Sequence, residues 1–267
     1  MVSQFKLPLL STFATSEELS DKSRFQYFSR LVPPDSIATE AMTQLMIEFE
    51  WSYIQLLYAE GSYGENAAKG VEKNAKKRGI CIGYSYRLNA DDSNDYEAIA
   101  KKLIEHKKAR VIAMIAGSYY MRNILTAIEK ISKGEQFIFM VVDSFGRISN
   151  YEHRQNGTLQ IIYDGGIDHD FANYMYSLKP QQAKHHWEKQ LWEKLGRCNY
   201  TLDATDPTSC LKHSNFSNTT LYPYSSSAVK YSDGVEVYAK AIKDLIESSC
   251  PDAFNNKSLL KVIDQFF

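Results

Sequence analysis

The sequence of 267 residues has no apolar run long enough to span a membrane and no strong excess of charge of either sign. A spanning helix needs about 20 apolar residues. The formal net charge is −1, so no overall field attracts nucleic acid or a membrane surface. Met1 to Leu10 lacks the long apolar core of a signal peptide. Because Val2 to Ser11 resembles the end of a helix that runs into a buried strand, we expect the chain to be a fragment whose start lies upstream.

Motifs for catalysis and metal binding are also missing. The sequence contains no P-loop, GxGxxG, GxSxG or HExxH motif, the patterns typical of phosphate, dinucleotide, acyl-transfer and zinc chemistry. His185 and His186 are adjacent, so on a helix they point about 100° apart and make a poor metal pair. We therefore expect no enzyme activity, no cofactor and no metal site.

What the sequence does contain is a regular alternation of apolar runs and helical patterns. Apolar residues make up 44% and charged residues 24%, as in ordinary globular proteins. The alternation predicts a parallel sheet with helices on both faces, a complete α/β unit over 33–163. Its predicted strands cover 53–58, 80–88, 110–116, 137–142 and 159–163, and its predicted helices cover 36–49, 65–78, 95–106 and 119–132.

Two further pieces flank this unit. Before it, Lys6 to Ser11 predicts a strand. After it, helical patterns occur near 169–178, 181–195 and 227–248, and a last one starts around Lys257. We expect the two flanking pieces, 1–32 and 164–267, to join into another lobe.

The run from Glu60 to Glu65 lies where a predicted strand gives way to a predicted helix. In open α/β sheets, small ligands bind beyond the carboxyl ends of the strands. Gly61 and Gly64 let the backbone turn sharply there. Tyr63 can offer its ring to a substrate cation, or the run is a plain connecting loop with an exposed tyrosine.

Other polar residues also follow predicted strands. Asp143 ends an apolar strand, where a carboxylate is costly to bury unless it is paired, and Ser118 follows the strand before it. Asp35 is either a helix N-cap or a ligand carboxylate. The hydroxyls and amides of Ala14-Thr15-Ser16 either hold an anion or cap a loop. Two carboxylates, a tyrosine and a hydroxyl-lined turn suit a zwitterionic ligand, and binding rather than bond breaking.

Several features indicate the secretory route. Five N-x-Ser/Thr glycosylation signals occur, three of them in a polar, loop-like stretch. Cys198 and Cys210 bracket a short polar loop and can close it as a disulfide. Cys81 lies in a strand pattern, where a small buried side chain is the simplest interpretation, and Cys250 is left over. The five signals are at Asn156, Asn199, Asn215, Asn218 and Asn256.

A set of motifs resembles a known family. In order and spacing, the chain is similar to the extracellular ligand-binding domain of metabotropic glutamate receptors, which are class C G-protein-coupled receptors. The resemblance covers essentially the whole chain and is most specific over 28–65. It rests on Leu19-Ser20-Asp21-Lys22, Phe28-Ser29-Arg30-Leu31-Val32-Pro33-Pro34-Asp35-Ser36, Trp51-Ser52-Tyr53, Glu60-Gly61-Ser62-Tyr63-Gly64-Glu65, Asp143-Ser144-Phe145-Gly146, the pair Cys198 and Cys210, Cys250-Pro251 and Lys257-Ser258-Leu259-Leu260.

The resemblance implies a bilobed α/β fold of the periplasmic-binding-protein-like, or Venus flytrap, type, with parallel sheets flanked by helices. Residues 1–32 would be a first-lobe remnant, 33–163 the second lobe, and 164–267 the continuation of an incomplete first lobe. The domain would sense an amino acid, L-glutamate by family, and signal by lobe closure.

The resemblance also implies roles for individual residues. Ala14 and Thr15 would hold the α-amino acid head, and Ser118 would line the second-lobe wall. Lys257 would reach the distal carboxylate of glutamate, with Arg147 near the same end. The residues that would face the ammonium group are Asp35, Tyr63 and Asp143.

Implied partners are the amino-acid ligand, a homodimer partner through the first lobe, and a G protein through domains outside this chain. Cys81 would form a disulfide with a following cysteine-rich domain. The location would be the plasma membrane, on the extracellular side. Alternatives are a solute-binding protein, another receptor ectodomain of the same fold, or a truncated product that does not signal.

Overall fold

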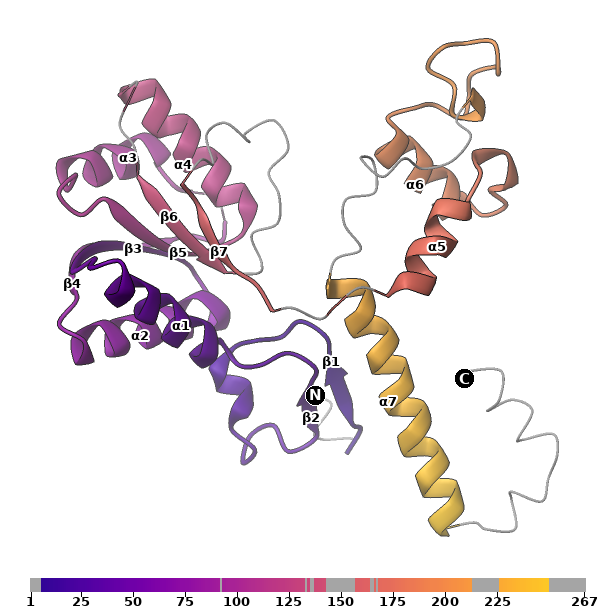
Figure 1. Cartoon of the computed structure of the whole chain (residues 1–267), viewed down its shortest axis with the longest axis horizontal. Coiled ribbons are helices and arrows are strands. Elements are labelled where there is room, and N and C mark those ends of the chain that lie inside the picture. The colour runs from indigo at the N-terminus through magenta and orange to yellow at the C-terminus, as the bar shows by residue number, and fades with distance from the viewer. Residues whose placement is uncertain are drawn as a thin grey trace. The chain divides into compact units, whose positions relative to one another are not determined.

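The computed structural model describes residues 6–91, 93–132, 134, 137–142, 157–163, 166, 168–212 and 226–249. The chain divides into two compact units, Met1–Tyr163 and Asp164–Phe267. Figure 1 shows the elements of both.

The first unit is built on a five-stranded sheet in which every neighbouring pair is parallel. The strand order is β4-β3-β5-β6-β7, so the first strand of the sheet lies inside it and the second lies at its edge. The strands are β3 (Tyr53–Ala59), β4 (Cys81–Leu88), β5 (Val111–Ile115), β6 (Ile138–Val142) and β7 (Leu159–Ile161).

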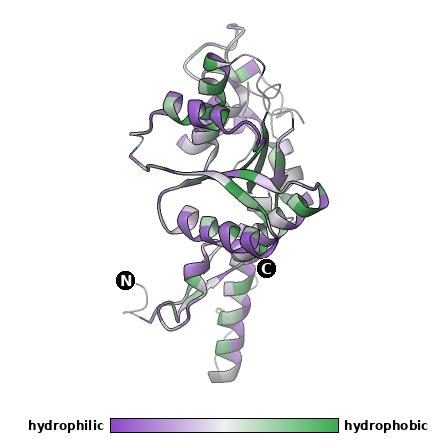
Figure 2. Cartoon of the chain, turned by 90° about the vertical axis from the view of Figure 1, so that its left-hand side faces the viewer, coloured by the Kyte–Doolittle hydropathy of each residue, from purple (hydrophilic) through white to green (hydrophobic). Residues whose placement is uncertain are grey.

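Helices cover both faces of this sheet. Helices α1 (Asp35–Glu48) and α2 (Ser62–Lys77) bury Met42, Met46 and Val71 against one face. Helices α3 (Tyr96–Glu105) and α4 (Ser118–Ile131) bury Leu103 and Ile124 against the other. In Figure 2 the strands carry the green of apolar residues, whereas the helices are striped with hydrophilic purple. The predicted α/β fold with a parallel sheet between helices is confirmed.

The position of strand β5 explains why its segment of the sequence is an unbroken apolar run. Val111, Ala113 and Ile115 point toward α1 and α2, and Ile112 and Met114 point toward α3 and α4. All five are almost fully buried. Side chains alternate between the faces of a strand, so a strand covered on both faces needs apolar residues at every position.

Gln55 of β3 is a polar residue buried in this core. Its Nε2 donates to the carbonyl oxygens of Ala109 at 2.8 Å and Leu103 at 3.1 Å. The Leu103 carbonyl is in the last turn of α3, where helix carbonyls lack partners within the helix. Gln55 therefore ties the end of α3 to the sheet.

A smaller parallel sheet precedes this core. It pairs β1 (Leu9–Ser11) with β2 (Phe28–Arg30), and the 3-10 helix η2 (Glu17–Ser20) lies between them in sequence. The strand predicted over 6–11 is therefore shorter than expected, and β2 was not predicted. Helix α2 begins at Ser62 rather than at residue 65, which places Tyr63 in its first turn.

The second unit is mainly helical. It contains α5 (His169–Ser177), the 3-10 helices η5 (Pro180–Gln182) and η6 (Cys210–Lys212), α6 (His186–Gly196) and α7 (Ser226–Ser249). The helix predicted over 181–195 is thus split, because the Glu188 carboxylate accepts hydrogen bonds from the Lys184 and His185 amides and defines a new helix start. Trp192 of α6 is buried in an apolar cluster of this unit.

Helix α7 carries exposed apolar side chains spaced alternately four and three residues apart, the spacing of a seam along one side of a helix. None of the helices within the described ranges is both long enough and apolar enough to cross a membrane. The seam residues are Tyr231, Val235, Tyr238, Ile242 and Leu245.

Candidate ligand-binding site

The carboxyl edge of the large sheet gathers the starts of two helices. Strands β3 and β5 are parallel neighbours, so the segments that follow them leave the sheet at the same edge. After β3 comes α2 with Tyr63 in its first turn, and after β5 comes α4 with Ser118 as its first residue. Strand β6 lies beside β5; Asp143, which follows β6 in sequence, is outside the described residues.

Asp35 is the first residue of α1 and is only 3% exposed. Within the described part of the chain, its Oδ2 atom is buried without a hydrogen-bond partner. Burial raises the pKa of the Asp35 carboxyl to about 6, although a hydrogen bond from the Thr15 side chain and the positive charge of Arg30 both lower it. A buried acceptor with no donor is costly, and an ammonium group would supply the missing donor and a compensating charge.

The N-cap interpretation of Asp35 is wrong. The cap position is held by Pro34, and no side chain caps this helix. The Asp35 side chain is therefore not used by its own helix.

The turn at Ala14, Thr15 and Ser16 is fixed through its carbonyl groups. Arg30 Nη1 donates to the Ala14 and Ser16 carbonyl oxygens at 3.3 and 2.9 Å. The Asp35 amide donates to the Thr15 carbonyl at 2.8 Å. Three consecutive carbonyls are thus occupied, and the turn is held against both β2 and the start of α1. Arg30 is not among the predicted site residues, because the strand that positions it, β2, is too short to show an alternating pattern in the sequence.

A second set of hydrogen bonds joins this turn to α2. Ser16 Oγ lies 2.9 Å from Ser62 Oγ and 3.1 Å from the Ser62 carbonyl oxygen. Ser62 is adjacent to Tyr63, whose half-buried side chain packs on the apolar cluster under α1 and α2. The structure therefore links Thr15, Asp35 and the Tyr63 helix through bonded neighbours.

Two glycines shape the entry into α2. Gly61 precedes the helix with φ of +102°, a conformation that residues with a side chain rarely adopt. A Cβ atom on Gly64 would lie 2.0 Å from the Ala59 carbonyl oxygen. The first turn of α2 therefore sits directly on the end of β3, which fixes where Tyr63 starts.

Not all predicted residues are placed. Asp143, Arg147 and Lys257 lie outside the described residues, so their proposed contacts stay predictions. Ser118 is half-buried at the same sheet edge as Tyr63, one strand away.

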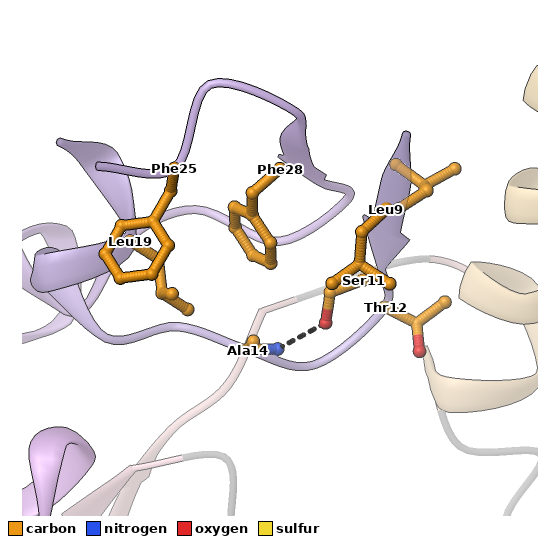
Figure 3. A pocket seen from close by; sticks show the side chains of 8 residues that line it. Leu9, Ser11, Thr12, Ala14, Leu19, Phe25 and Phe28 are labelled. Carbon is orange, nitrogen blue, oxygen red and sulfur yellow. Dashed lines mark hydrogen bonds between the residues drawn. The ribbon is translucent and has the colours of Figure 1, made fainter. Parts of the chain in front are cut away.

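An open cavity of about 480 Å³, lined in part by Ala14, lies between β1, η2 and β2. Figure 3 shows Leu9, Leu19, Phe25 and Phe28 around it, and the hydrogen bond that ties the Ala14 amide to Ser11 Oγ at 3.0 Å. These walls are apolar and offer a zwitterion no charged partner, so we do not assign the amino-acid site to this cavity.

Comparison with known proteins decides the family. Residues 1–265 match the sequence profile of the family described as "Receptor family ligand binding region". The chain belongs to this family of receptor ligand-binding regions. It is a family of receptors and not of enzymes.

This receptor ligand-binding region is similar to metabotropic glutamate receptors. It is 29% identical over 222 residues to the metabotropic glutamate receptor of Drosophila melanogaster, covering 81% of the chain. It is 30% identical over 201 residues to metabotropic glutamate receptor 8 of Homo sapiens and of Mus musculus, covering 73% of the chain. The match spans only 22% of the length of each of these curated relatives.

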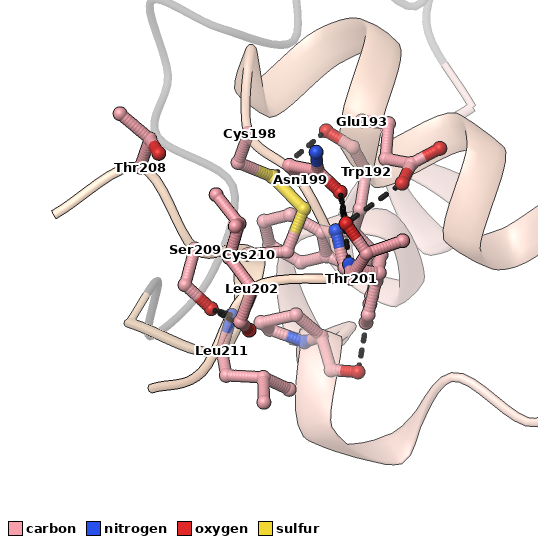
Figure 4. The surroundings of a disulfide bond; sticks show 12 residues. Trp192, Glu193, Cys198, Asn199, Thr201, Leu202, Thr208, Ser209, Cys210 and Leu211 are labelled. Carbon is pink, nitrogen blue, oxygen red and sulfur yellow. Dashed lines mark hydrogen bonds between the residues drawn. A yellow bond between two sulfur atoms is a disulfide. The ribbon is translucent and has the colours of Figure 1, made fainter. Parts of the chain in front are cut away.

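In this receptor ligand-binding region the Cys198–Cys210 disulfide, expected from the sequence, is formed. Figure 4 shows the bond beside Trp192 and Asn199. Asn199 is exposed, and its Oδ1 accepts hydrogen bonds from the Thr201 amide at 2.8 Å and the Thr201 hydroxyl at 2.7 Å. Glycosylation there is untested. The other candidates, Asn156, Asn215, Asn218 and Asn256, lie outside the described residues.

Cys81 has a free thiol and is exposed at the start of the edge strand β4. The interpretation of Cys81 as a small buried side chain is therefore wrong, because the edge position leaves its side chain open to solvent. A disulfide from Cys81 to another domain stays a prediction.

Proposed function

We propose that this chain is part of the extracellular amino-acid-sensing domain of a class C G-protein-coupled receptor, with L-glutamate as the ligand. The observation that carries the proposal is the buried Asp35 carboxylate, whose Oδ2 has no donor among the described residues. It lies next to the Thr15 turn and on the helix that packs against α2. An α-ammonium group fits this acceptor by charge and by hydrogen bonding.

In this proposal the ammonium group contacts Asp35, Asp143 and the ring of Tyr63, since an aromatic face attracts a cation. The Ala14-Thr15 turn holds the α-carboxylate through the Thr15 backbone amide, since the Thr15 hydroxyl already donates to Asp35 and the Ala14 amide to Ser11. Ser118 lines the wall of the second lobe. Lys257 and Arg147 bind the distal carboxylate, which distinguishes glutamate from amino acids with neutral side chains.

The signalling step in this proposal is closure of two lobes around the ligand. Residues 33–163 form the second lobe, and 1–32 with 164–267 belong to the first. Shifting the open and closed populations from 1:99 to 99:1 requires about 5.5 kcal/mol of differential affinity. Charge-assisted hydrogen bonds supply about 1.5–3 kcal/mol each, so a few contacts to both lobes are enough.

The proposal places the domain on the extracellular side of the plasma membrane, as a homodimer through the first lobe. The G protein acts through parts of the receptor outside this chain. The relatives' names support this assignment, because they are metabotropic glutamate receptors.

The test is calorimetric titration with L-glutamate, and with glutarate, which has the same two carboxylates but no ammonium group. We expect weak or absent binding to residues 1–267 alone, and restored binding when an upstream first-lobe segment of a relative is joined to the chain. In the joined protein, glutarate should bind at least tenfold more weakly than L-glutamate.

The matched variant is Asp35→Asn, which keeps the shape of the side chain and removes its charge. It should lose the preference for L-glutamate over glutarate. Equal affinities of the two compounds for the unmodified joined protein would exclude ammonium recognition at Asp35 and overturn the proposal.

A further inference from the structure

A directed chain of hydrogen bonds joins the Thr15 turn to the Tyr63 helix. A charged carboxylate only accepts hydrogen bonds, so the Ser62 hydroxyl is the donor in its hydrogen bond to Glu18 Oε2. The Ser16 hydroxyl then donates toward Ser62, whose Oγ and carbonyl oxygen are 2.9 and 3.1 Å away. The direction Ser16 to Ser62 to Glu18 follows from the carboxylate at its end.

Other contacts support the same chain. The Ser62 hydroxyl is the largest influence that lowers the pKa of Glu18, and Arg24 Nη2 lies 2.7 Å from Glu18 Oε1. Asn66 Nδ2 donates to the Ser62 carbonyl at 2.8 Å and reaches Ser16 Oγ at 3.4 Å. Ser16 is 6% exposed, so its hydroxyl has little water to replace a lost partner.

These bonds differ from the contacts that hold the turn elsewhere. Arg30 and the Asp35 amide tie the turn to β2 and to the start of α1. The Ser16 and Ser62 pair extends the connection to α2, across 46 residues of sequence. Without this pair, the turn would stay attached to α1 while the Tyr63 end of α2 would lose a fixed distance to it.

We propose that Ser16 and Ser62 are positioning residues: they touch no ligand, but their hydrogen bond joins the Thr15 turn of the proposed first lobe to the Tyr63 helix of the proposed second lobe, and so favours the closed arrangement of the two. This inference rests on the proposed amino-acid site. It predicts that the two hydroxyls act as one unit.

The test is a double-mutant cycle with Ser16→Ala, Ser62→Ala and the double variant. Hydrogen exchange of residues 12–20 is measured without ligand in the 267-residue chain, and L-glutamate affinity is measured in the joined protein described above. Each single variant should speed exchange over 12–20 about three- to tenfold and weaken L-glutamate by a similar factor, the range that one hydrogen bond supports. The double variant should be no worse than either single one.

Two controls separate positioning from general destabilisation. Ser62→Thr keeps the hydroxyl at an exposed position and should restore exchange and affinity. Ser85→Ala, at an exposed position of β4, should change neither. Exchange over strands β3 and β5 should be the same in all variants.

Additive effects of the two single variants, or unchanged exchange over 12–20 in Ser62→Ala, would overturn the positioning role. Absence of L-glutamate binding by the unmodified joined protein would instead overturn the proposed function. The exchange measurement would still decide whether the two hydroxyls act together.

Discussion

The backbone amide of Asp35 donates to the carbonyl oxygen of Thr15 at 2.8 Å. This bond sets the start of α1 against a turn 20 residues earlier in the sequence, so the buried carboxylate and the hydroxyl-lined turn lie side by side. In the proposed receptor the bond crosses from the first lobe to the second, and it therefore contributes to the closed arrangement.

Asp35→Asn should weaken L-glutamate binding to the joined protein about 10- to 150-fold, because it removes a charge-assisted hydrogen bond of about 1.5–3 kcal/mol. Calorimetry measures this loss. Asp21→Asn is the matched control, since Asp21 is exposed and its carboxylate accepts hydrogen bonds from the amide and the hydroxyl of the nearby Ser23. An equal loss in both variants would contradict a specific role for Asp35.

The stability of the first unit should depend on pH through Asp35. Its pKa is about 6 in the folded chain, above the ordinary value of 3.8, so the folded state binds the proton more tightly than the unfolded state. The stability it provides is complete below pH 4 and is lost as the pH rises through 6. At about 1.36 kcal/mol per pKa unit, the loss is about 3 kcal/mol. Urea unfolding of the wild type and Asp35→Asn between pH 4 and pH 7.5 measures it; a constant difference between the two would contradict the shift.

Arg30→Met should loosen residues 12–20, because it removes the donors that hold the Ala14 and Ser16 carbonyls. It should also raise the Asp35 pKa further, since the Arg30 charge lowers that pKa. Arg30→Lys should still lower the Asp35 pKa through its positive charge. It should not hold both carbonyl oxygens, because an ammonium lacks the planar fork of a guanidinium. Hydrogen exchange reports the first effect, and the pH dependence of unfolding reports the second. If Arg30→Lys and Arg30→Met give the same hydrogen exchange and the same pH dependence of unfolding, Arg30 does not have these two roles.

Gly64→Ala should destabilise the first unit by about 2–4 kcal/mol, since the new methyl group would overlap the Ala59 carbonyl oxygen. Gly117→Ala is the control: Gly117 lies at the start of a helix at the same carboxyl edge, immediately before α4, but nothing lies within 4 Å of an added Cβ. Urea unfolding compares the two. Similar losses would show that the close approach at Gly64 is not the cause.

Replacing both Cys198 and Cys210 by serine should destabilise the second unit by about 3 kcal/mol, as expected for a disulfide that closes a short loop. Hydrogen exchange in α6 should rise, because Trp192 and Cys210 share one buried cluster. Exchange in β3 and β5 of the first unit should not change, and a uniform rise across both units would count against the prediction.

The large sheet could be predicted from the sequence because strands buried on both faces, such as β5, leave unbroken apolar runs. The predicted start of α2 is three residues too late. The close packing of Gly64 on the Ala59 carbonyl, which fixes the first turn of this helix, depends on the folded structure and leaves no pattern in the sequence. Asp35 could be identified from the sequence as a candidate ligand residue. The sequence could not show, however, that Pro34 and not Asp35 occupies the cap position of α1.

The link between Ser16 and Ser62 could not be predicted at all. Both serines lie in polar stretches with ordinary turn-forming composition, and 46 residues separate them. Short β2 was also missed, because a three-residue strand has too few positions to show an alternating pattern.

The strand order has a consequence for how the protein is made. Of the five strands of the large sheet, β3 is synthesised first and can pair with β4 once α2 and β4 have been made, but its other side stays open until β5 is synthesised. For that interval the nascent chain presents an unpaired strand edge, the kind of surface that invites wrong partners. Chaperone demand should therefore peak while α3 is still being translated.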